Sequence, residues 1–227
     1  MGGGVMAGLI GLLRGLFGGT GTAQTGQSGR DAGLSADEAR AAIAELSGGD
    51  AETLRVFDAA LVGTLPEDSP FDAGDDQVTT GVAIMAALYA TGRAVLLDWS
   101  AGMEEACAAF GQLFLQKGVA AGELPATIAF DGQMKRGDAV GLAYVTFRKI
   151  ADAQASRILG INAGTDGYCF VLMPEVPAAR WASVRIDAQC YFEDSDWQFK
   201  QQLRAAGLTT RSERHPSRAP RPAPAAL

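Results

Sequence analysis

A predicted β-hairpin late in the sequence constrains the fold of this chain more than any other feature. Residues 158–163 and 168–173 are two apolar segments of strand length, and they flank the turn sequence Gly164-Thr-Asp-Gly167. Glycine and aspartate favour tight turns, and two such segments around a short turn are typical of a hairpin with a four-residue loop. The chain is therefore expected to contain a sheet whose apolar strands need helices to cover them.

Three helices are predicted ahead of this sheet. Ser35 and Glu38 match a capping box, in which the two side chains satisfy the first backbone amides of a helix. Asp50 is placed to cap a second helix, because an aspartate side chain accepts hydrogen bonds from the first turn. Residues 78–88 carry apolar side chains at helical spacing and predict a third helix, which Gly92 ends.

Strands and helices alternate in the middle of the chain. Residues 94–99 and 126–130 are predicted strands, and the second is closed by a turn at Asp131 and Gly132. Asp138 is predicted to cap a long helix. The inward faces of the two helices in this region are expected to carry apolar or small residues three or four positions apart, namely Met103, Cys107, Phe110 and Phe114, then Tyr144, Phe147, Ala151 and Ala155.

After the hairpin, the sequence predicts two helices and one more strand. Pro174 and Pro177 end the second hairpin strand, and a short helix follows through Trp181. Residues 189–192 are predicted to form a fifth strand. A last helix over residues 196–206 is expected to pack three large side chains against the body: Trp197, Phe199 and Leu203.

Together these elements predict an α+β protein, with a helical N-terminal third and a mixed sheet of four or five strands that helices cover. In this interpretation residues 35–206 form a single domain. Residues 1–34 are a flexible, glycine-rich lead. Residues 207–227, rich in arginine, proline and alanine, are a disordered tail because they lack the apolar area that ordering requires.

Charge is unevenly distributed along the chain. The formal net charge is -7, but the tail after Thr210 carries four arginines against Glu213, a local charge of +3, which leaves -10 for residues 1–210. An acidic body repels phosphate backbones, so nucleic acid is a poor candidate partner. The three cysteines form neither a Cys-x-x-Cys pair nor an even set, which indicates thiols in a reducing compartment.

The N-terminal segment has two interpretations. Leu12, Leu16 and Phe17 belong to an apolar helical face, which predicts contact of residues 5–17 with a membrane or a partner protein. The many glycines of residues 1–30 oppose a helix, at about 1 kcal/mol each, and favour a flexible lead. The chain lacks a cationic signal-peptide start and the ~18 consecutive apolar residues of a membrane span, so we expect the protein in the cytoplasm.

Two segments of the chain resemble a known family. One joins Ala-Ala-Leu at residues 86–88 to Leu-Asp-Trp at 97–99 and to an acidic helix start at 104–105. The other, residues 157–174, has a small-residue turn with an aspartate ahead of an apolar strand. Together, within residues 80–175, they resemble DUF6630, an uncharacterised bacterial family. The resemblance implies a fold and brings no known activity or functional residue.

The usual catalytic motifs are absent from the sequence. Its one histidine, His215, lies in the predicted tail, so a Ser-His-Asp triad, a Cys-His pair or a histidine-rich metal site has no histidine to use. Neither the Gly-x-x-x-x-Gly-Lys-Ser/Thr loop nor the Gly-x-Gly-x-x-Gly fingerprint between a strand and a helix occurs, and the cysteine spacing fits no zinc finger. No cofactor is predicted, and an enzyme is the less favoured interpretation.

Carboxylates are the chemistry that remains. Asp98 and Asp131 each end a predicted strand, at the edge where open α/β sheets bind ligands, and Asp166 reaches the same edge if its strand runs parallel to theirs. Three such carboxylates would suit Mg²⁺ or an acid/base pair. The competing interpretation is structural, because aspartate commonly caps helices and forms turns, and this explains each residue separately.

Three functions are left open by these patterns. A non-enzymatic binding or regulatory module with a protein partner comes first, a carboxylate-dependent metal-binding hydrolase second, and a peripheral membrane or scaffold protein third. A tryptophan near the end of an element can anchor a partner, although a partly buried core indole is the alternative. The candidate interaction residues are Trp99, Trp181, Leu12, Leu16 and Phe17.

Overall fold

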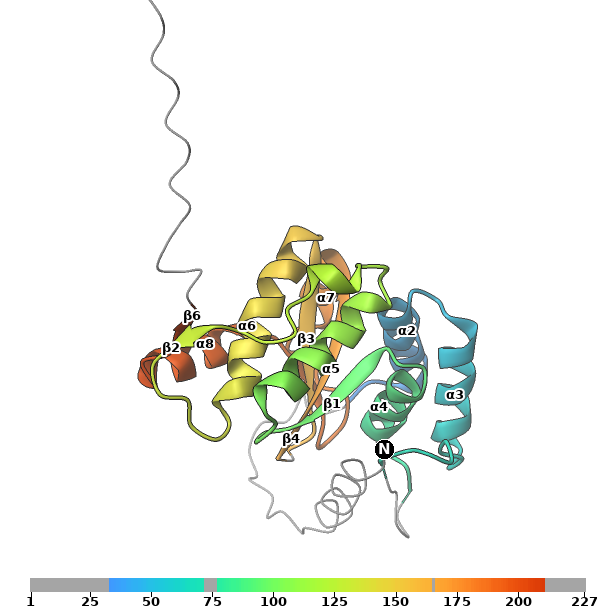
Figure 1. Ribbon diagram of the computed structural model, residues 1–227. Helices are drawn as coiled ribbons and strands as arrows, with labels where there is room; N and C mark the ends of the chain where they lie inside the picture. The colour runs from blue at the N-terminus through green and yellow to red at the C-terminus, as the bar shows by residue number, and fades with distance from the viewer. Residues whose placement is uncertain (1–32, 72–76, 165, 211–227) are drawn as a thin grey trace, which may run out of the picture.

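A four-stranded antiparallel sheet is the centre of the fold (Figure 1). The computed structural model describes residues 33–71, 77–164 and 166–210. The strand order is β1 (Ala94–Asp98), β4 (Gly167–Pro174), β3 (Ser156–Asn162) and β5 (Tyr191–Glu193). The predicted hairpin is confirmed as β3 and β4, and the α+β class is confirmed with it. The sequence predicted a mixed sheet, but every neighbouring pair of strands in this sheet is antiparallel.

Four helices cover one face of the sheet. They are α2 (Ala36–Ser47), α3 (Ala51–Leu61), α4 (Thr80–Ala90) and α7 (Glu175–Trp181). The capping box of α2 is present, since the Glu38 amide donates to Ser35 Oγ and the Ser35 amide donates to Glu38 Oε2. Asp50 caps α3 as predicted, accepting from the Thr53 amide at 2.9 Å. This half of the core packs against Val171 and other strand side chains that face it.

Three helices cover the opposite face. They are α5 (Met103–Leu115), α6 (Asp138–Ala153) and α8 (Asp196–Ala205). Aromatic rings join them to the sheet: the centroid of Phe110 lies 5.6 Å from that of Phe147 and 5.0 Å from that of Phe170 on β4. Tyr144 extends the cluster to Phe199 of α8, 4.9 Å away. The apolar faces predicted for α5 and α6 are therefore buried, apart from Ala155 and the half-buried Met103.

A second, two-stranded sheet lies apart from the first. β2 (Phe130–Asp131) pairs with β6 (Thr209–Thr210), and the 3-10 helix η1 (Ala121–Glu123) precedes β2. The strand predicted over residues 126–130 is thus confirmed at Phe130 alone. β6 also carries the body past residue 206, where the sequence placed the start of the tail, and Leu208 is buried just before it. Composition could not predict β6, because its two threonines depend on pairing with a single partner strand, β2.

Three side chains lie elsewhere than the sequence predicted. Ala155 follows the end of α6, is exposed and has a φ of +48°. Trp197 is 72% exposed, whereas Phe199 on the same helix is buried, because α8 presents one narrow stripe to the core. Asp138 is the first residue of α6 and not its cap, and its buried carboxylate accepts the Lys135 amide at 2.8 Å.

A charged network fastens the end of β5 to α6 and β3. Arg148, with a side chain only 9% exposed, donates to Asp194 Oδ1 at 3.0 Å and to Asp152 at 2.9 Å. Arg157 reaches the other Asp194 oxygen at 3.2 Å, and the Tyr144 hydroxyl lies 3.3 Å from Oδ1. Burial raises the pKa of Asp194, but the two guanidinium charges and a backbone amide outweigh it and hold that pKa below its usual value.

Candidate functional site

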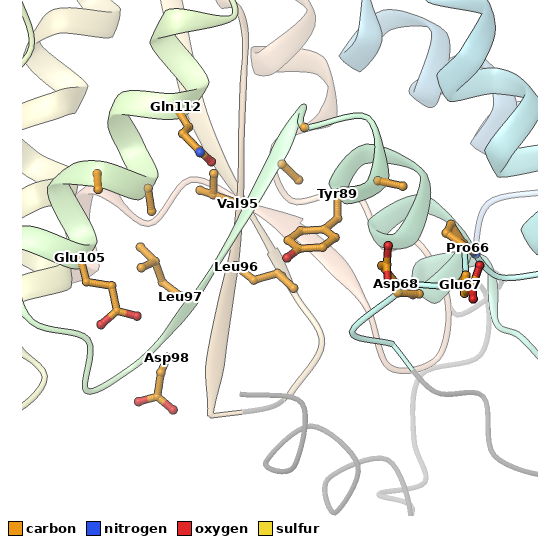
Figure 2. A pocket seen from close by; sticks show the side chains of 16 residues that line it. Pro66, Glu67, Asp68, Tyr89, Val95, Leu96, Leu97, Asp98, Glu105 and Gln112 are labelled. Carbon is orange, nitrogen blue, oxygen red and sulfur yellow. The ribbon is translucent and has the colours of Figure 1, made fainter. Parts of the chain in front are cut away.

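A groove of about 860 Å³ runs along β1, the edge strand of the main sheet (Figure 2). The five residues of β1 form its floor. One wall is α5, and the other is the end of α4 with residues 66–69. Among the described residues, no strand pairs with the outer side of β1. The groove therefore follows a strand edge along its whole length.

The hydrogen-bond register decides which backbone groups of β1 face this groove. The Trp99 amide, directly after β1, donates to the Asp166 carbonyl of the β4 side at 3.1 Å. In an antiparallel pair, alternate residues direct both N–H and C=O to the same neighbour. Leu97 and Val95 therefore point their backbone groups at β4, as Trp99 does.

The residues between them point the other way. The amides and carbonyls directed at the outer edge of β1 belong to Ala94, Leu96 and Asp98. Buried or half-buried backbone groups need hydrogen-bond partners, and an unpaired edge is a template for another strand. The floor of the groove is thus a row of donors and acceptors with the spacing that an extended chain would match.

The α5 wall of the groove carries small side chains at its centre. Glu105, Ala108, Ala109 and Gln112 lie three and four positions apart, so they occupy one face of the helix. Figure 2 shows Glu105 and Gln112 on the α5 side of β1. The two alanines between them are the smallest side chains that a helix can present without glycine. A strand laid along β1 would therefore find space for its own side chains on this side.

The opposite wall contains one aromatic ring. Tyr89, near the end of α4, lies beside Leu96 in Figure 2. Its ring meets Phe71 edge-on, at 6.3 Å between centroids and an interplanar angle of 89°. Phe71 is buried, so the contact fixes the tyrosine ring as part of the wall. Pro66 and the residues after it continue this wall.

The charge of the groove has one sign. Its lining includes four carboxylates, Glu67, Asp68, Asp98 and Glu105, and no lysine, arginine or histidine among the residues that the structure describes. Arg93, the cation next to β1 in sequence, lies 3.4 Å from Asp50 and lines a separate hollow. Carboxylates on both walls therefore give the groove a negative potential, which attracts cationic groups.

The three candidate aspartates are only partly brought together. Asp98 and Asp166 lie at the same end of the main sheet, because β1 and β3 run in the same direction on either side of β4. Asp131 ends β2, which belongs to the separate two-stranded sheet. Asp98 Oδ1 accepts the amide and hydroxyl of Ser100 at 2.7 and 2.6 Å, as a turn residue does. In the described part of the chain, no group of three His, Cys, Asp or Glu is placed to hold a metal ion.

The candidate interaction residues differ in their surroundings. Trp99 follows β1 directly, is 37% exposed and has the Arg136 guanidinium 4.9 Å from its ring centroid. Trp181 is 8% exposed, and its Nε1 donates to Glu45 Oε2 at 2.5 Å, which makes it a core residue with one polar partner. Leu12, Leu16 and Phe17 lie outside the described residues. None of the described helices is long and apolar enough to cross a membrane.

All three cysteines are free and buried. Burial raises the pKa of Cys107 to about 11, and it raises the pKa of Cys190 to about 12 with a further contribution from Asp187. The pKa of Cys169 is also raised by burial. Because the thiolate is the reactive form, these shifts disfavour a nucleophilic role for any of the three.

The groove could not be predicted from the sequence, because the residues that line it come from three separate segments of the chain. Residues 94–99 are a predictable strand, but the position of β1 at the sheet edge depends on pairing with residues far along the chain, from Ala94 with Val171 to Asp98 with Gly167. Asp98 was the one lining residue singled out, as the end of a strand. Comparisons of the chain with protein-family models, curated proteins and solved structures found no match. The resemblance to DUF6630 stays a prediction.

Proposed function

We propose that this protein is a non-enzymatic binding module that takes an extended, positively charged peptide segment of a partner protein along β1. One observation carries the proposal: the outward backbone groups of β1 lie at the floor of a groove of about 860 Å³ that runs along this edge strand. Strand addition to a sheet edge is a common mode of peptide recognition. The three buried thiols support the cytoplasm as its compartment.

Backbone hydrogen bonds would supply the affinity. The five residues of β1 span about 17 Å, which accommodates about five residues of an added strand. Leu96 lies at the centre of this edge and offers one N–H and one C=O to the incoming chain. Each such bond contributes about 1 kcal/mol net, and more where the groove walls exclude water.

The walls would supply the selectivity. Side chains of an added strand point alternately to its two sides, so successive residues would meet α5 and Tyr89 in turn. Carboxylates stand on both sides, with Glu105 on α5 and Glu67 and Asp68 on the opposite wall. A segment with lysine or arginine is favoured by this arrangement, and an acidic segment is repelled.

Replacing Leu96 tests the proposal at its centre. Proline at position 96 removes an outward amide while leaving the hydrogen bonds to β4 intact, and valine at the same position keeps the amide. The probes are two labelled ten-residue peptides, one alternating valine with lysine and one alternating valine with glutamate. We expect the lysine peptide alone to bind in fluorescence anisotropy, and Leu96→Pro to weaken it ~10-fold or more while Leu96→Val leaves it nearly unchanged.

Two controls separate the groove from general attraction to an acidic protein. Melting curves of both variants establish that each is folded at the temperature of the titration. Glu67→Gln with Glu105→Gln should weaken the lysine peptide, while Glu52→Gln, in an exposed pair with Arg55 outside the groove, should not. Equal binding of the two peptides, or unchanged affinity in a folded Leu96→Pro protein, would contradict strand addition at β1.

A further inference from the structure

The chain itself carries a segment with the chemistry that the groove selects. Resting on the proposed function, we infer that residues 211–227 of this chain occupy the groove along β1, so that a partner segment must displace them. The described structure ends at Thr210 in β6, and these residues follow it directly. Binding of a partner segment is then a competition with residues 211–227 for the same strand edge.

Charge complementarity is the first support. Residues 211–227 contain four arginines and one acid, Glu213, whereas the lining of the groove has four carboxylates and no cation among the described residues. The arginines are Arg211, Arg214, Arg218 and Arg221. Arg218 and Arg221 are an odd number of positions apart, so in an extended chain their side chains point to opposite sides. Carboxylates on both walls of the groove match that arrangement.

The placement of the prolines is the second support. Proline has no amide to donate, so an added strand tolerates it only where the amide points away from the sheet. The four prolines of the segment, Pro216, Pro220, Pro222 and Pro224, all occupy even positions. Because hydrogen-bonding positions alternate along a strand, the odd positions from 217 to 225 can all donate to β1 while every proline faces outward. The pattern fits an edge-bound strand in one register and excludes the other.

The reach of the segment is sufficient. An extended chain advances about 3.3 Å per residue, so the stretch from Thr210 to Ser217, the first pairing position, spans up to about 23 Å. A folded body of roughly 170 residues has a radius of gyration of about 16 Å. The tether is longer than this radius, which makes β1 a reachable target from β6; Figure 1 places β1 next to α5.

A tethered segment in the groove lowers the apparent affinity of a partner segment, because the two compete for the same edge. A short tether gives an effective concentration in the millimolar range, so even a weak intramolecular contact competes with a free peptide. Salt would loosen the contact, because Glu67, Asp68 and Glu105 of the groove are exposed to solvent. A partner with a better match to the same edge would replace it.

The experiment uses the full chain and a full-length variant with Arg211→Gln, Arg214→Gln, Arg218→Gln and Arg221→Gln. Hydrogen exchange resolved by NMR measures the Leu96 and Asp98 amides, which point to the outer edge of β1. We expect both amides to exchange ~10-fold or more faster in the variant, since the contact that covers them is weakened. Glu213→Gln in the same segment is the matched control, and it should not speed exchange.

A second measurement distinguishes the two proposals. A synthetic peptide of residues 211–227, added in trans, should bind the variant with the four Arg→Gln substitutions at least ~10-fold more tightly than it binds the native chain. Equal exchange at Leu96 and Asp98 and equal peptide affinity in the two chains would overturn self-occupancy. If the alternating valine-lysine peptide still binds both chains and is lost in Leu96→Pro, the groove remains a peptide site and only the named occupant is wrong.

Discussion

The two edges of the main sheet are treated differently by the chain. The outer side of β5 is covered by the segment just before it, since the Ser183 amide donates to the Phe192 carbonyl and the Phe192 amide to the Val184 carbonyl, both at 2.9 Å. β5 is only three residues long, and the charged network around Asp194 fastens its end. The outer side of β1 has five residues and a groove in place of such a cover.

The two edges therefore differ in length and in how the described residues cover them. Exposed strand edges invite unwanted pairing, and proteins usually shorten or cover them. The chain does both at β5 and, in its described residues, neither at β1. Among the described residues, the β1 edge is open beside a groove lined by carboxylates, and it is the edge that the proposed function uses.

The largest expected effect comes from loosening the closed edge. Asp194→Asn removes the charge shared by Arg148 and Arg157 and should destabilise the fold by about 3 kcal/mol at neutral pH, because Arg148 is almost fully buried. The folded pKa of Asp194 is lowered, so its contribution is fully present above the unfolded value of about 4 and is lost as pH falls through the folded pKa. Denaturant unfolding at several pH values measures it.

The matched control for this change is Asp58→Asn. Asp58 pairs with Arg40 at the surface, where both side chains are about half exposed, so its loss should cost far less stability than that of Asp194. A loss of similar size in the two variants would mean that the network is not what closes the β5 edge. A difference between Asp194→Asn and native protein that persists unchanged at pH 2 would also contradict the assignment.

A smaller effect is expected at the end of the open edge. Asp98→Ala deletes the acceptor of two hydrogen bonds from Ser100 and should destabilise the fold by about 1 kcal/mol, while Asp98→Asn, which keeps an acceptor, should cost less. Thermal unfolding with and without Mg²⁺ or Mn²⁺ should give the same melting temperature, because Asp98 acts as a turn residue. A rise with metal concentration that disappears in Asp98→Asn would restore the metal-binding hypothesis.

The smallest expected change in stability comes from a substitution in the segment that covers β5. Ser183 lies in the segment that covers β5 and has a φ of +70°, a conformation that favours glycine; its amide donates to the Phe192 carbonyl of β5. Ser183→Gly should relieve strain and stabilise the fold by about 0.5 kcal/mol, whereas Ser183→Ala keeps the strain and should have little effect. Slower exchange of the Phe192 amide in Ser183→Gly would confirm that the cover has become firmer, and faster exchange would contradict it.

Local patterns predicted much of the fold and little of the groove. The capping box at Ser35 and the hairpin around Gly164 were predictable because each depends on residues a few positions apart. The pairing of β1 with β4, the antiparallel course of the sheet and the strand at Thr209 depend on contacts between distant segments. Trp197 was misplaced for a related reason, since helical spacing shows which residues share a face but not how wide the buried stripe is.

The carboxylates on the groove walls also have a consequence for the chain as one of many copies in solution. Two free β1 edges could in principle meet across a twofold axis and join two sheets into one. Such a meeting would bring Glu67, Asp68, Asp98 and Glu105 of each copy against the same set of the other, and like charges brought close together repel. The acidic walls therefore guard against self-association through β1 while they leave that edge open to a segment of opposite charge.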